Sequence, residues 1–567
     1  MKASDYIIEY LIRSNITRVY GYIGGMITHL VNSIYLKKDI EMISTITEQG
    51  AAFAAEGEAR ITGNTGVVMV TSGPGATNLV TGIASCFFDS TPVIFITGQV
   101  NTYEYKGNIP IRQNGFQETE IVSIVRPITK YSVLVDNVEN LRYELEKAIF
   151  LTQDKRKGPV LLDIPMNIQQ TSLNFQGARS FFDSVEYKDL SKNCSYKTEY
   201  SMLIDLLKKA KRPLILAGSG VRSANAVAEF RDFLVKTQVP VVESLLGIDS
   251  VSKDYKYNMG LIGSYGNRFG NYALANSDFL LVLGSRLDTR QTGTEVNKFL
   301  RETKIVRVDI DPSELKFSKV KSEIAYCCDL KTFLLGLLKC NVCIEINEWY
   351  AKILEYKNTY PSYKTDKGKI KNPNYFIYVL SQKLKENDVI IADVGQNQMW
   401  TAQSLNVKYK QRMVFSGGMG AMGFALPTSI GAALSFNHRI IVIVGDGGMQ
   451  MNIQELEILK RRNLKIKIIV MNNFCLGMVR QFQEKYFNKC YACTVEDYSA
   501  PNFTEIAWAY GLKASNVSLD DEDWEYKLDN FLKTDSPEIF NFLLDINAEV
   551  EPKLLTGKSF EDLYKEY

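Results

Sequence analysis

The feature that most constrains the fold of this chain is a repeated alternation of short β-branched runs with segments of helical periodicity. The runs are Val67–Thr71, Pro92–Thr97, Val160–Ile164, Pro213–Ala217, Val239–Val242, Phe279–Leu283, Lys304–Val308, Val389–Ala392, Ile440–Val444 and Lys467–Met471. Strands that alternate with helices are typical of parallel sheets with helices packed on both faces. The pattern therefore predicts an α/β protein.

Polar stretches divide the chain into three such blocks. The 567 residues suffice for about three to four domains. A linker is predicted at Gln176–Lys197, and a long surface connection rich in Lys, Tyr and Asn at Glu355–Asn374. The predicted domains are residues 1–185, 198–345 and 375–550, followed by a polar tail at 551–567. We expect three doubly wound parallel sheets, although the blocks are not visibly repetitive in sequence.

Composition excludes several classes of protein. With 46% apolar and 23% charged residues and a formal net charge of +2, the chain has no electrostatic reason to bind nucleic acid or an anionic membrane. No apolar run is long enough to span a bilayer, and Met1–Arg13 has Asp5 and Glu9 within an amphipathic helical pattern. We expect a cytoplasmic protein with no membrane partner.

The counts of cysteine and histidine limit the chemistry. The nine cysteines are expected to be reduced. The pairs Cys340/Cys343 and Cys490/Cys493 are interpreted as buried thiols and not as a zinc site, because they are about 150 residues apart and lack a nearby His. Only two histidines are present, which leaves little scope for a His general base or a multi-His metal centre. We expect an organic cofactor to perform the difficult chemistry.

The most informative local motif lies at two successive strand ends in the third block. One predicted strand runs into Gly445-Asp446-Gly447 and the next into Asn472-Asn473. Because ligands gather beyond the carboxyl ends of parallel strands, Asp446 and Asn473 are expected side by side. A carboxylate and an amide oxygen are hard ligands that suit Mg²⁺ or Ca²⁺, and glycines such as Gly447 let a diphosphate approach the backbone. The motif predicts a site for a metal and a diphosphate.

These motifs resemble those of acetolactate synthases, which are thiamine-diphosphate (ThDP) enzymes, over nearly the whole chain. The matching segments are Gly21–Gly25, Glu48–Ala52, Thr71–Asn78, Gly115–Glu118, Arg126–Lys130, Val394–Gln396 and Ser416–Gly423. The resemblance implies a pyrimidine-binding (PYR) first domain, a central FAD-binding domain and a diphosphate-binding (PP) third domain. It also implies ThDP, Mg²⁺ and FAD as cofactors.

The resemblance further implies a role for each matching residue. Glu48 would hydrogen-bond N1′ of the aminopyrimidine and favour the imino tautomer, which takes the proton from the thiazolium carbon, while Gln117 and Gly25 would face the reacting carbon. The other implied ThDP contacts are Gly395, Gln396, Met399, Gly420, Met422, Asp446, Gly447 and Asn473, with Met399 forcing the V-shape of the cofactor. Asp446, Asn473 and the backbone carbonyl of Cys475 would hold the metal.

The second block contains a weak dinucleotide signal. Gly218-Ser219-Gly220 follows a predicted strand and precedes a helix expected from about Ala224. The resemblance strengthens this signal, since arginines pair with a diphosphate and carboxylates with ribose hydroxyls. The implied FAD contacts are Arg156, Gly218, Gly220, Gly284, Arg286, Asp288, Arg290, Asp309 and Asp329.

The sequence departs from the family where the second substrate is expected to bind. Phe482 stands where acetolactate synthases have a tryptophan tied to acceptor choice, and Met166 stands where they have a lysine. Together with Met478 these residues form the predicted acceptor pocket. Asn108–Asn114 does not reproduce the family's arginine-containing loop, and whether Arg112 substitutes for that arginine stays open on the sequence alone. The loss of a cation weakens the case for an acceptor carboxylate, and phenylalanine leaves a somewhat larger space.

Two acceptors therefore stay open on the sequence alone. The resemblance implies a carboligase that decarboxylates pyruvate to hydroxyethyl-ThDP and transfers the two-carbon unit to an acceptor carbonyl. A second pyruvate would give 2-acetolactate. A ketone such as a nucleotide-linked keto-sugar would give a branched-chain sugar for surface polysaccharide.

Other classes of function are less favoured. A decarboxylase that releases aldehyde commonly uses histidines near the reacting carbon, and a paralogue without activity would not need Glu48, Asp446 and Asn473 together. A flavoenzyme of the pyruvate-oxidase kind remains an alternative. The family also implies a homodimer or homotetramer in which Glu48 and Asp446 of one active site come from different chains, while the sequence leaves a regulatory subunit unknown.

Overall fold

The computed structural model describes residues 1–192, 199–363, 372–554 and 557–566, and contains three six-stranded parallel sheets. Contacts divide the chain into two compact units. The first comprises residues 1–195, 416–440 and 448–466, and the second comprises residues 196–415, 441–447 and 467–567. The prediction of three doubly wound parallel sheets is confirmed, whereas the predicted domain boundaries stay predictions.

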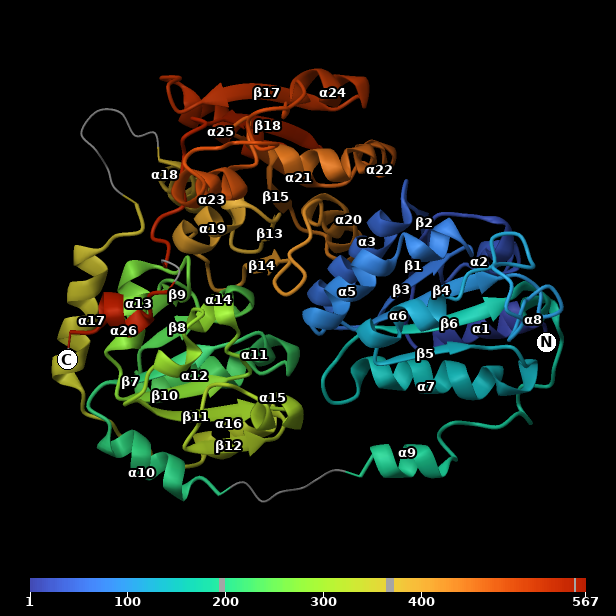
Figure 1. The fold of residues 1–567 in the computed structure, drawn as a ribbon, viewed down its shortest axis with the longest axis horizontal. Coiled ribbons are helices and arrows are strands. Elements are labelled where there is room, and N and C mark those ends of the chain that lie inside the picture. Colours follow the sequence, from blue (N-terminus) through green and yellow to red (C-terminus); the bar gives the residue numbers. More distant parts are fainter. Residues whose placement is uncertain (193–198, 364–371, 555–556, 567) are drawn as a thin grey trace. The chain divides into compact units, whose positions relative to one another are not determined.

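The first sheet, in the first unit, has the strand order β2-β1-β3-β4-β6-β5. Its strands are β1 (Arg18–Gly21), β2 (Glu41–Ser44), β3 (Gly66–Val70), β4 (Val93–Gln99), β5 (Tyr131–Leu134) and β6 (Val160–Pro165). Its helices are α1 (Ala3–Arg13), α2 (Thr28–Tyr35), α3 (Glu48–Thr62), α4 (Pro74–Thr77), α5 (Val80–Phe88), α6 (Ile121–Val125), α7 (Leu141–Gln153), α8 (Met166–Gln170) and α9 (Val185–Leu190). Alternate strand residues such as Val67 and Met69 pack in one core with α1 and α7, which Figure 1 shows beside the sheet.

The second sheet has the order β12-β11-β10-β7-β8-β9. Its strands are β7 (Pro213–Ala217), β8 (Val241–Glu243), β9 (Asn258–Leu261), β10 (Phe279–Leu283), β11 (Lys304–Asp309) and β12 (Ile324–Cys327). Its helices are α10 (Ser201–Lys209), α11 (Gly220–Ser223), α12 (Val227–Thr237), α13 (Arg268–Ala275), α14 (Thr289–Thr292), α15 (Pro312–Lys316), α16 (Leu330–Leu338) and α17 (Asn347–Thr359). Leu214 and Leu216 face a core with α13 and α17, while Ile215 and Ala217 face a core with α12 and α16.

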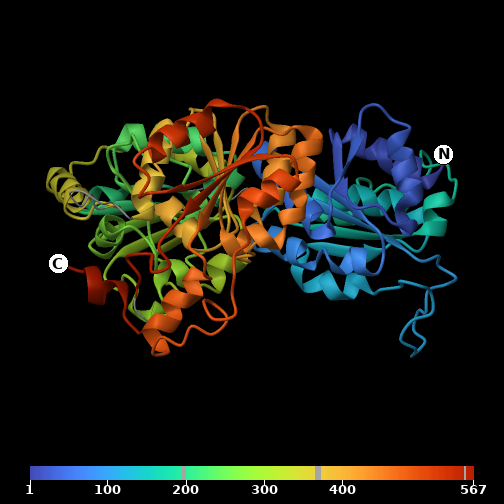
Figure 2. The same ribbon diagram turned by 90° about the horizontal axis from the view of Figure 1, so that it is seen from above.

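The third sheet has the order β14-β13-β15-β16-β18-β17, the same as the first sheet once the strands are counted from one. Its strands are β13 (Val389–Ala392), β14 (Arg412–Phe415), β15 (Ile440–Gly445), β16 (Ile466–Asn472), β17 (Lys513–Ser518) and β18 (Glu538–Leu543). The remaining helices are α18 (Pro373–Lys383), α19 (Gln396–Ser404), α20 (Ala425–Ser435), α21 (Asp446–Met451), α22 (Leu456–Arg462), α23 (Gly477–Tyr486), α24 (Phe503–Ala509), α25 (Trp524–Lys533) and α26 (Phe560–Tyr564). Figure 2 gives a second view of the same ribbon.

Every predicted β run overlaps a strand, but several boundaries differ. β8 begins at Val241 and not at Val239, because Pro240 between them has no N–H to donate to a neighbouring strand. The helix expected from Ala224 is two helices, α11 and α12. The segment between β15 and β16 forms α21, then a 3₁₀ turn at Ile453–Glu455, and then α22 from Leu456.

The two predicted connections contain more structure than expected. Gln176–Lys197 includes α9, and Glu355–Asn374 overlaps the end of α17 and the start of α18. Residues 193–198 and 364–371 of these connections lie outside the described residues.

The interpretation of the C-x-x-C pairs as buried thiols was wrong. Cys343, Cys490 and Cys493 are exposed and Cys340 is half-buried, since both pairs lie in polar segments after helices. None of the described helices is long and apolar enough to cross a membrane.

Candidate cofactor and acceptor sites

Each sheet changes its direction of winding between two central strands, and the predicted cofactor segments follow those strands. In the first sheet this switch lies between β1 and β3, in the third between β13 and β15, and in the second between β7 and β10. The second sheet, read from β9 to β12, has the order 3-2-1-4-5-6 that binds dinucleotides at this crevice. All three switch points are therefore positioned to bind a ligand.

Asp446 and Asn473 lie at the carboxyl ends of β15 and β16, which are neighbours in the third sheet. They are only 2% and 4% exposed. The N–H of Cys475, two residues beyond Asn473, donates to the Asp446 carboxylate, so the two strand ends are in contact. The Asn473 amide nitrogen donates to Gln396 Oε1 at 2.8 Å, which commits that nitrogen and leaves the amide oxygen as the acceptor. The structure thus brings together the carboxylate and the amide oxygen that the sequence predicts.

The electrostatics of Asp446 suit a cation. Burial raises the pKa of its carboxyl to about 6, although the N–H groups of Gly447 and Cys475 donate to it and oppose the rise. A buried carboxylate gains free energy when a cation offsets the cost of its desolvation. The Cys475 carbonyl, the third predicted ligand, also accepts the Gly477 N–H at 2.9 Å.

Within the described residues no three His, Cys, Asp or Glu side chains cluster as a metal site. One carboxylate with amide and carbonyl oxygens is a sparse donor set. Such a set fits Mg²⁺, which takes its remaining ligands from phosphate and water.

The segment after β13 approaches the same strand ends. Gly395 has a φ of 146°, and a Cβ added there would lie 2.6 Å from Asn397 Oδ1, so a side chain would be strained. Gln396 accepts the bond from Asn473 and donates to the Ala548 carbonyl at 2.9 Å. Met399, in α19, is 4% exposed and packs in the core of the third sheet.

Glu48 is the first residue of α3 in the first unit. It is half-buried, and its Oε2 accepts a hydrogen bond from Asn78 Nδ2 at 2.9 Å. The preceding turn is fixed by Glu455, whose carboxylate accepts the N–H groups of Ile46 and Thr47 at 3.2 and 3.0 Å. Glu455 is fully buried, and burial raises its pKa to about 7.

Sequence reasoning did not identify Glu455. It lies 409 residues from Ile46, and the only signal was an acidic residue beside the apolar positions that begin α22. A Cβ on Gly50 would lie 2.3 Å from Glu455 Oε1, which explains the glycine in this part of the matching segment.

The other predicted site residues of the first unit, Gly25, Gln117, Gly420 and Met422, lie in loops or short turns. A Cβ added to Gly25 or Gly420 would meet no atom within 4 Å, so both glycines border open space. Gln117 has a φ of 65°, a rare conformation for a residue with a side chain, next to Glu118, whose carboxylate accepts three backbone N–H groups of its own loop. Met422 is half-buried.

Asp89 holds the segment that contains Gly420. Its carboxylate accepts the N–H groups of Gly417 and Gly418 at 2.9 and 2.7 Å and pairs with Arg60. This role of Asp89 was also not predicted, because the partners are more than 300 residues apart (an interval of 328 for Gly417).

The predicted FAD segments of the second sheet meet at its switch point. A Cβ on Gly218 would lie 2.1 Å from the Gly284 carbonyl oxygen, and one on Gly220 would lie 2.6 Å from Gly284 Cα. Gly284 has a φ of 58°. The close approach of these two loops requires glycine, as expected where a diphosphate must reach the backbone.

The charged residues around this crevice have local partners. Arg286 pairs with Asp288 at 3.8 Å, and Asp288 also caps α14 by accepting the Arg290 N–H. Asp309 accepts the Asp311 N–H, and Asp329 caps α16. Each aspartate thus has a structural role in addition to the implied contact with FAD. Arg156, the remaining implied FAD contact, lies in the first unit, where its Nε donates to Ser90 Oγ at 3.0 Å.

The predicted acceptor residues come from α8 and α23. Met166 begins α8 and is half-buried. Met478 and Phe482 are one turn apart on α23, where Met478 packs against the core of the third sheet. The Phe482 side chain is 42% exposed, and its ring lies 4.7 Å from that of Tyr486.

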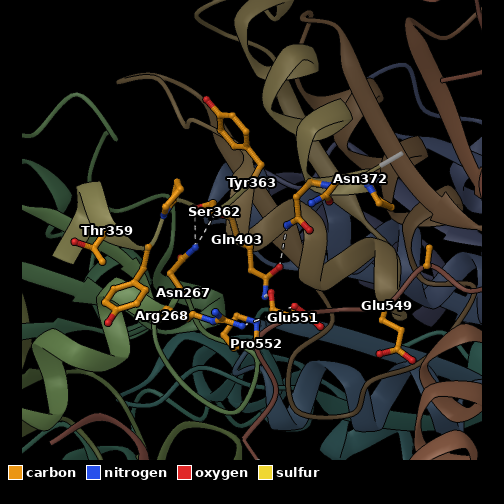
Figure 3. A pocket seen from close by; sticks show the side chains of 15 residues that line it. Asn267, Arg268, Thr359, Ser362, Tyr363, Asn372, Gln403, Glu549, Glu551 and Pro552 are labelled. Carbon is orange, nitrogen blue, oxygen red and sulfur yellow. Dashed lines mark hydrogen bonds and ion pairs between the residues drawn. The ribbon is translucent and has the colours of Figure 1, made fainter. Parts of the chain in front are cut away.

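A separate cavity of about 620 Å³ lies in the second unit. Its lining includes Asn267, Arg268, Gln403, Glu549 and Glu551, which Figure 3 shows as sticks. None of the predicted site residues lines it. Gln403 donates to the carbonyls of Tyr265 and Glu551 at 2.8 and 3.1 Å, so its amide ties the C-terminal segment to the second sheet's domain.

Comparison with known proteins gives the family. Three family models match, described as the N-terminal TPP binding domain (residues 1–124), the central domain (residues 201–337) and the C-terminal TPP binding domain (residues 393–542) of thiamine pyrophosphate enzymes. The chain is 35% identical to the acetolactate synthase large subunit of Lactococcus lactis subsp. lactis (strain IL1403), over 99% of this chain and 95% of that one. It is 33% identical to the acetolactate synthase isozyme 2 large subunit of Escherichia coli (strain K12), over 99% of both chains, and 34% identical to the chloroplastic acetolactate synthase of Arabidopsis thaliana, over 100% and 84%.

The chain belongs to the acetolactate synthase family of thiamine-pyrophosphate enzymes. The resemblance inferred from the sequence and the prediction of a ThDP-dependent enzyme of this type are confirmed. Full-length similarity to acetolactate synthases favours the acetolactate interpretation over transfer to a keto-sugar. The roles of individual residues, and Mg²⁺ and FAD as cofactors, stay predictions for this member of the family.

Proposed function

We propose that this enzyme condenses two molecules of pyruvate into 2-acetolactate. The donor pyruvate loses CO₂, its remaining two-carbon unit forms a bond to the carbonyl carbon of the acceptor pyruvate, and the acceptor oxygen takes up one proton. Two pyruvate anions and one proton thus give one 2-acetolactate anion and CO₂. Full-length similarity to proteins named acetolactate synthase carries the proposal.

The buried Asp446 and Asn473 would hold the metal that anchors the diphosphate of ThDP. When bound, ThDP supplies the nucleophilic carbon that attacks pyruvate. Both residues are nearly inaccessible and present oxygen atoms, and Gln396 fixes the orientation of the Asn473 amide. Gly395, whose φ of 146° disfavours a side chain, and Gly447, which has none, would let the phosphates approach the backbone.

Glu48 would hold and return the proton at N1′ of the aminopyrimidine. Its position at the start of α3 is supported by the Asn78 hydrogen bond and by the Glu455-anchored turn. A carboxylate held in one orientation loses little entropy when it binds its partner, which favours proton transfer at one atom. Gln117 and Gly25 would border the reacting carbon.

FAD would bind at the switch point of the second sheet. The glycines at 218, 220 and 284 allow close approach of the backbone, and Arg286 and Arg290 would pair with the diphosphate. The dinucleotide-binding strand order supports this assignment.

We also propose that the enzyme is a homodimer or homotetramer with shared active sites. Large apolar side chains beside the predicted cofactor loops are exposed in one chain, among them Ile23 (52%), Phe116 (79%) and Phe474 (46%). Exposed apolar groups of this size indicate surfaces that a second chain covers. The names of two relatives as large subunits suggest a smaller partner as well. The cytoplasmic location stays a prediction.

The proposal is tested by product analysis. Purified protein with ThDP, Mg²⁺, FAD and ¹³C-labelled pyruvate should yield labelled 2-acetolactate by mass spectrometry, with no oxygen uptake. Glu48→Gln should fold, retain flavin and lose at least about a hundredfold in turnover, while Glu58→Gln on the same helix should lose far less. Rapid transfer to a keto-sugar with slow self-condensation, or full turnover in Glu48→Gln, would contradict the proposal.

A further inference from the structure

The C-terminal segment places a cation against the predicted acceptor residue Phe482. Lys553 Nζ lies 5.0 Å from the centre of the Phe482 ring and 5.8 Å from the ring centres of Tyr486 and Tyr265. The faces of aromatic rings within about 6 Å attract a cation. The ammonium is therefore held among three rings, one of which replaces the family's tryptophan.

Hydrogen bonds on both sides of Lys553 fix this position. Gln481, the residue before Phe482, donates to the Val550 carbonyl at 2.9 Å and accepts the Val550 N–H at 3.1 Å. On the other side, the Leu554 N–H donates to the Ser264 carbonyl at 2.8 Å. The Glu551 carbonyl accepts a hydrogen bond from Gln403 Nε2 at 3.1 Å. Lys553 is thus not at a free end of the chain.

The charge of Lys553 is not neutralised within the part of the chain that the structure describes. Its ammonium has no ion-pair or hydrogen-bond partner there. Burial, and then Lys485, lower the pKa of this lysine, while Tyr486 and Glu549 raise it. A half-buried ammonium that has given up part of its water without gaining a counter-ion binds an anion more strongly than a fully hydrated one.

We propose that Lys553 determines acceptor specificity by recognising the carboxylate of a 2-oxo acid acceptor. This inference rests on the proposed carboligase function and adds the substrate group that the acceptor pocket binds. Met166 stands where the family has a lysine, so the pocket lacks that cation, and Lys553 would replace its charge. The cation is supplied from the C-terminal segment, next to Phe482. Lys553 contacts the acceptor and takes no part in bond making, so it is a specificity residue.

The test compares acceptors with and without a carboxylate on the holoenzyme. With pyruvate as donor, kcat/KM is measured for 2-oxobutanoate and for benzaldehyde, a neutral carbonyl compound, and the ratio of the two values is the readout. Lys553→Met should lower this ratio about tenfold, whereas Lys553→Arg should keep it within about threefold. Lys558→Met, an exposed lysine of the same segment, is the matched control.

Wild-type protein supplies a second measurement that needs no variant. Raising the salt concentration should raise KM for 2-oxobutanoate and leave KM for benzaldehyde unchanged, because salt screens only the charged acceptor. An unchanged ratio in Lys553→Met, an equal loss with both acceptors, or a salt-insensitive KM for 2-oxobutanoate would overturn the inference. Absence of any ligated product from the wild-type enzyme would instead overturn the proposed function on which it rests.

Discussion

Replacing Asp446 by asparagine should stabilise the cofactor-free protein while removing its ability to bind the cofactor. The pKa of Asp446 is raised by burial from 3.8 to about 6. Because the folded-state pKa lies above the unfolded value, the protein takes up protons on folding in this window, and stability falls as pH rises through it. Above about pH 6 the Asp446 carboxyl is ionised in the folded protein, and the full free-energy cost of burying its charge is present. Two pKa units correspond to about 3 kcal/mol, since each unit is worth about 1.36 kcal/mol.

Asparagine has the shape of the protonated acid and carries no charge, so it avoids this cost. In protein stripped of metal and ThDP, Asp446→Asn should therefore unfold at a temperature roughly 5 °C higher than wild type at pH 7.5. At pH 5, between the two pKa values, about half of the advantage should remain. Thermal unfolding followed by intrinsic fluorescence at both pH values measures the difference.

Adding Mg²⁺ and ThDP should reverse the order. Wild-type protein at about 100 times the dissociation constant gains about 2.7 kcal/mol from binding, whereas Asp446→Asn should gain nothing. Asp388→Asn is a matched control, because Asp388 is equally buried at the opposite end of β13 and accepts the Lys385 N–H at 2.7 Å. It should lower stability and keep the cofactor response. A less stable Asp446→Asn apoprotein, or a wild-type response to Mg²⁺ and ThDP in this variant, would refute the reasoning.

Two further changes test the supports of the cofactor loops. Glu455→Gln removes the carboxylate that holds the turn before Glu48, so turnover should fall about tenfold with ThDP still bound. Glu457→Gln, in the first turn of the following helix α22, should not alter turnover. Since the pKa of Glu455 is about 7, protonation below that pH should lower wild-type turnover, and the variant should lack this step in its pH profile. Gly218→Ala places a Cβ 2.1 Å from the Gly284 carbonyl, so flavin absorbance after gel filtration should be lost, whereas Gly177→Ala, with no neighbour closer than 3.7 Å, should retain it. A flavin content in Gly218→Ala equal to wild type would count against the FAD assignment.

The central strands could be predicted from the sequence and the edge strands could not. The strands β2, β5, β9, β12, β14 and β17 form the edges of the three sheets, and none of them was predicted. β17 shows the reason, because its polar residues leave no continuous apolar run, while β12 is only four residues long and none of them is buried. A central strand such as β15, buried on both faces, is apolar throughout its length. Two interior strands were also missed: β1, which has only four residues, and β18, in which Glu538 and Asn541 interrupt the apolar residues.

The residues of the candidate site also divide into those that could be predicted from the sequence and those that could not. Asp446 and Asn473 could be paired from the sequence because each directly follows a predicted strand, and strand ends of a parallel sheet share one edge. Glu455, Asp89 and Lys553 could not be found in this way. Each acts on a segment far along the chain, and each looks in the sequence like an ordinary charge near a helix or in a polar tail. Long-range contacts of this kind leave no local spacing to detect.

The repetition of the first and third sheets explains how two distant segments are held together. α3 follows the second strand of the first sheet, and α20 follows the equivalent strand of the third, β14. These helices pack on each other in the first unit through reciprocal glycine contacts. A Cβ on Gly57 would lie 2.1 Å from the Thr428 carbonyl oxygen, and one on Gly431 would lie 1.8 Å from that of Ala54.

Reciprocal contacts between equivalent helices are what a two-fold relation produces. Glu48 begins α3, and the segment Ser416–Gly423, predicted to contact the aminopyrimidine, ends just before α20. The pair formed by α3 and α20 therefore positions both Glu48 and the segment Ser416–Gly423. The topology is repeated although the sequences are not, because such a pair requires only small residues at the crossing and leaves the other positions free to change.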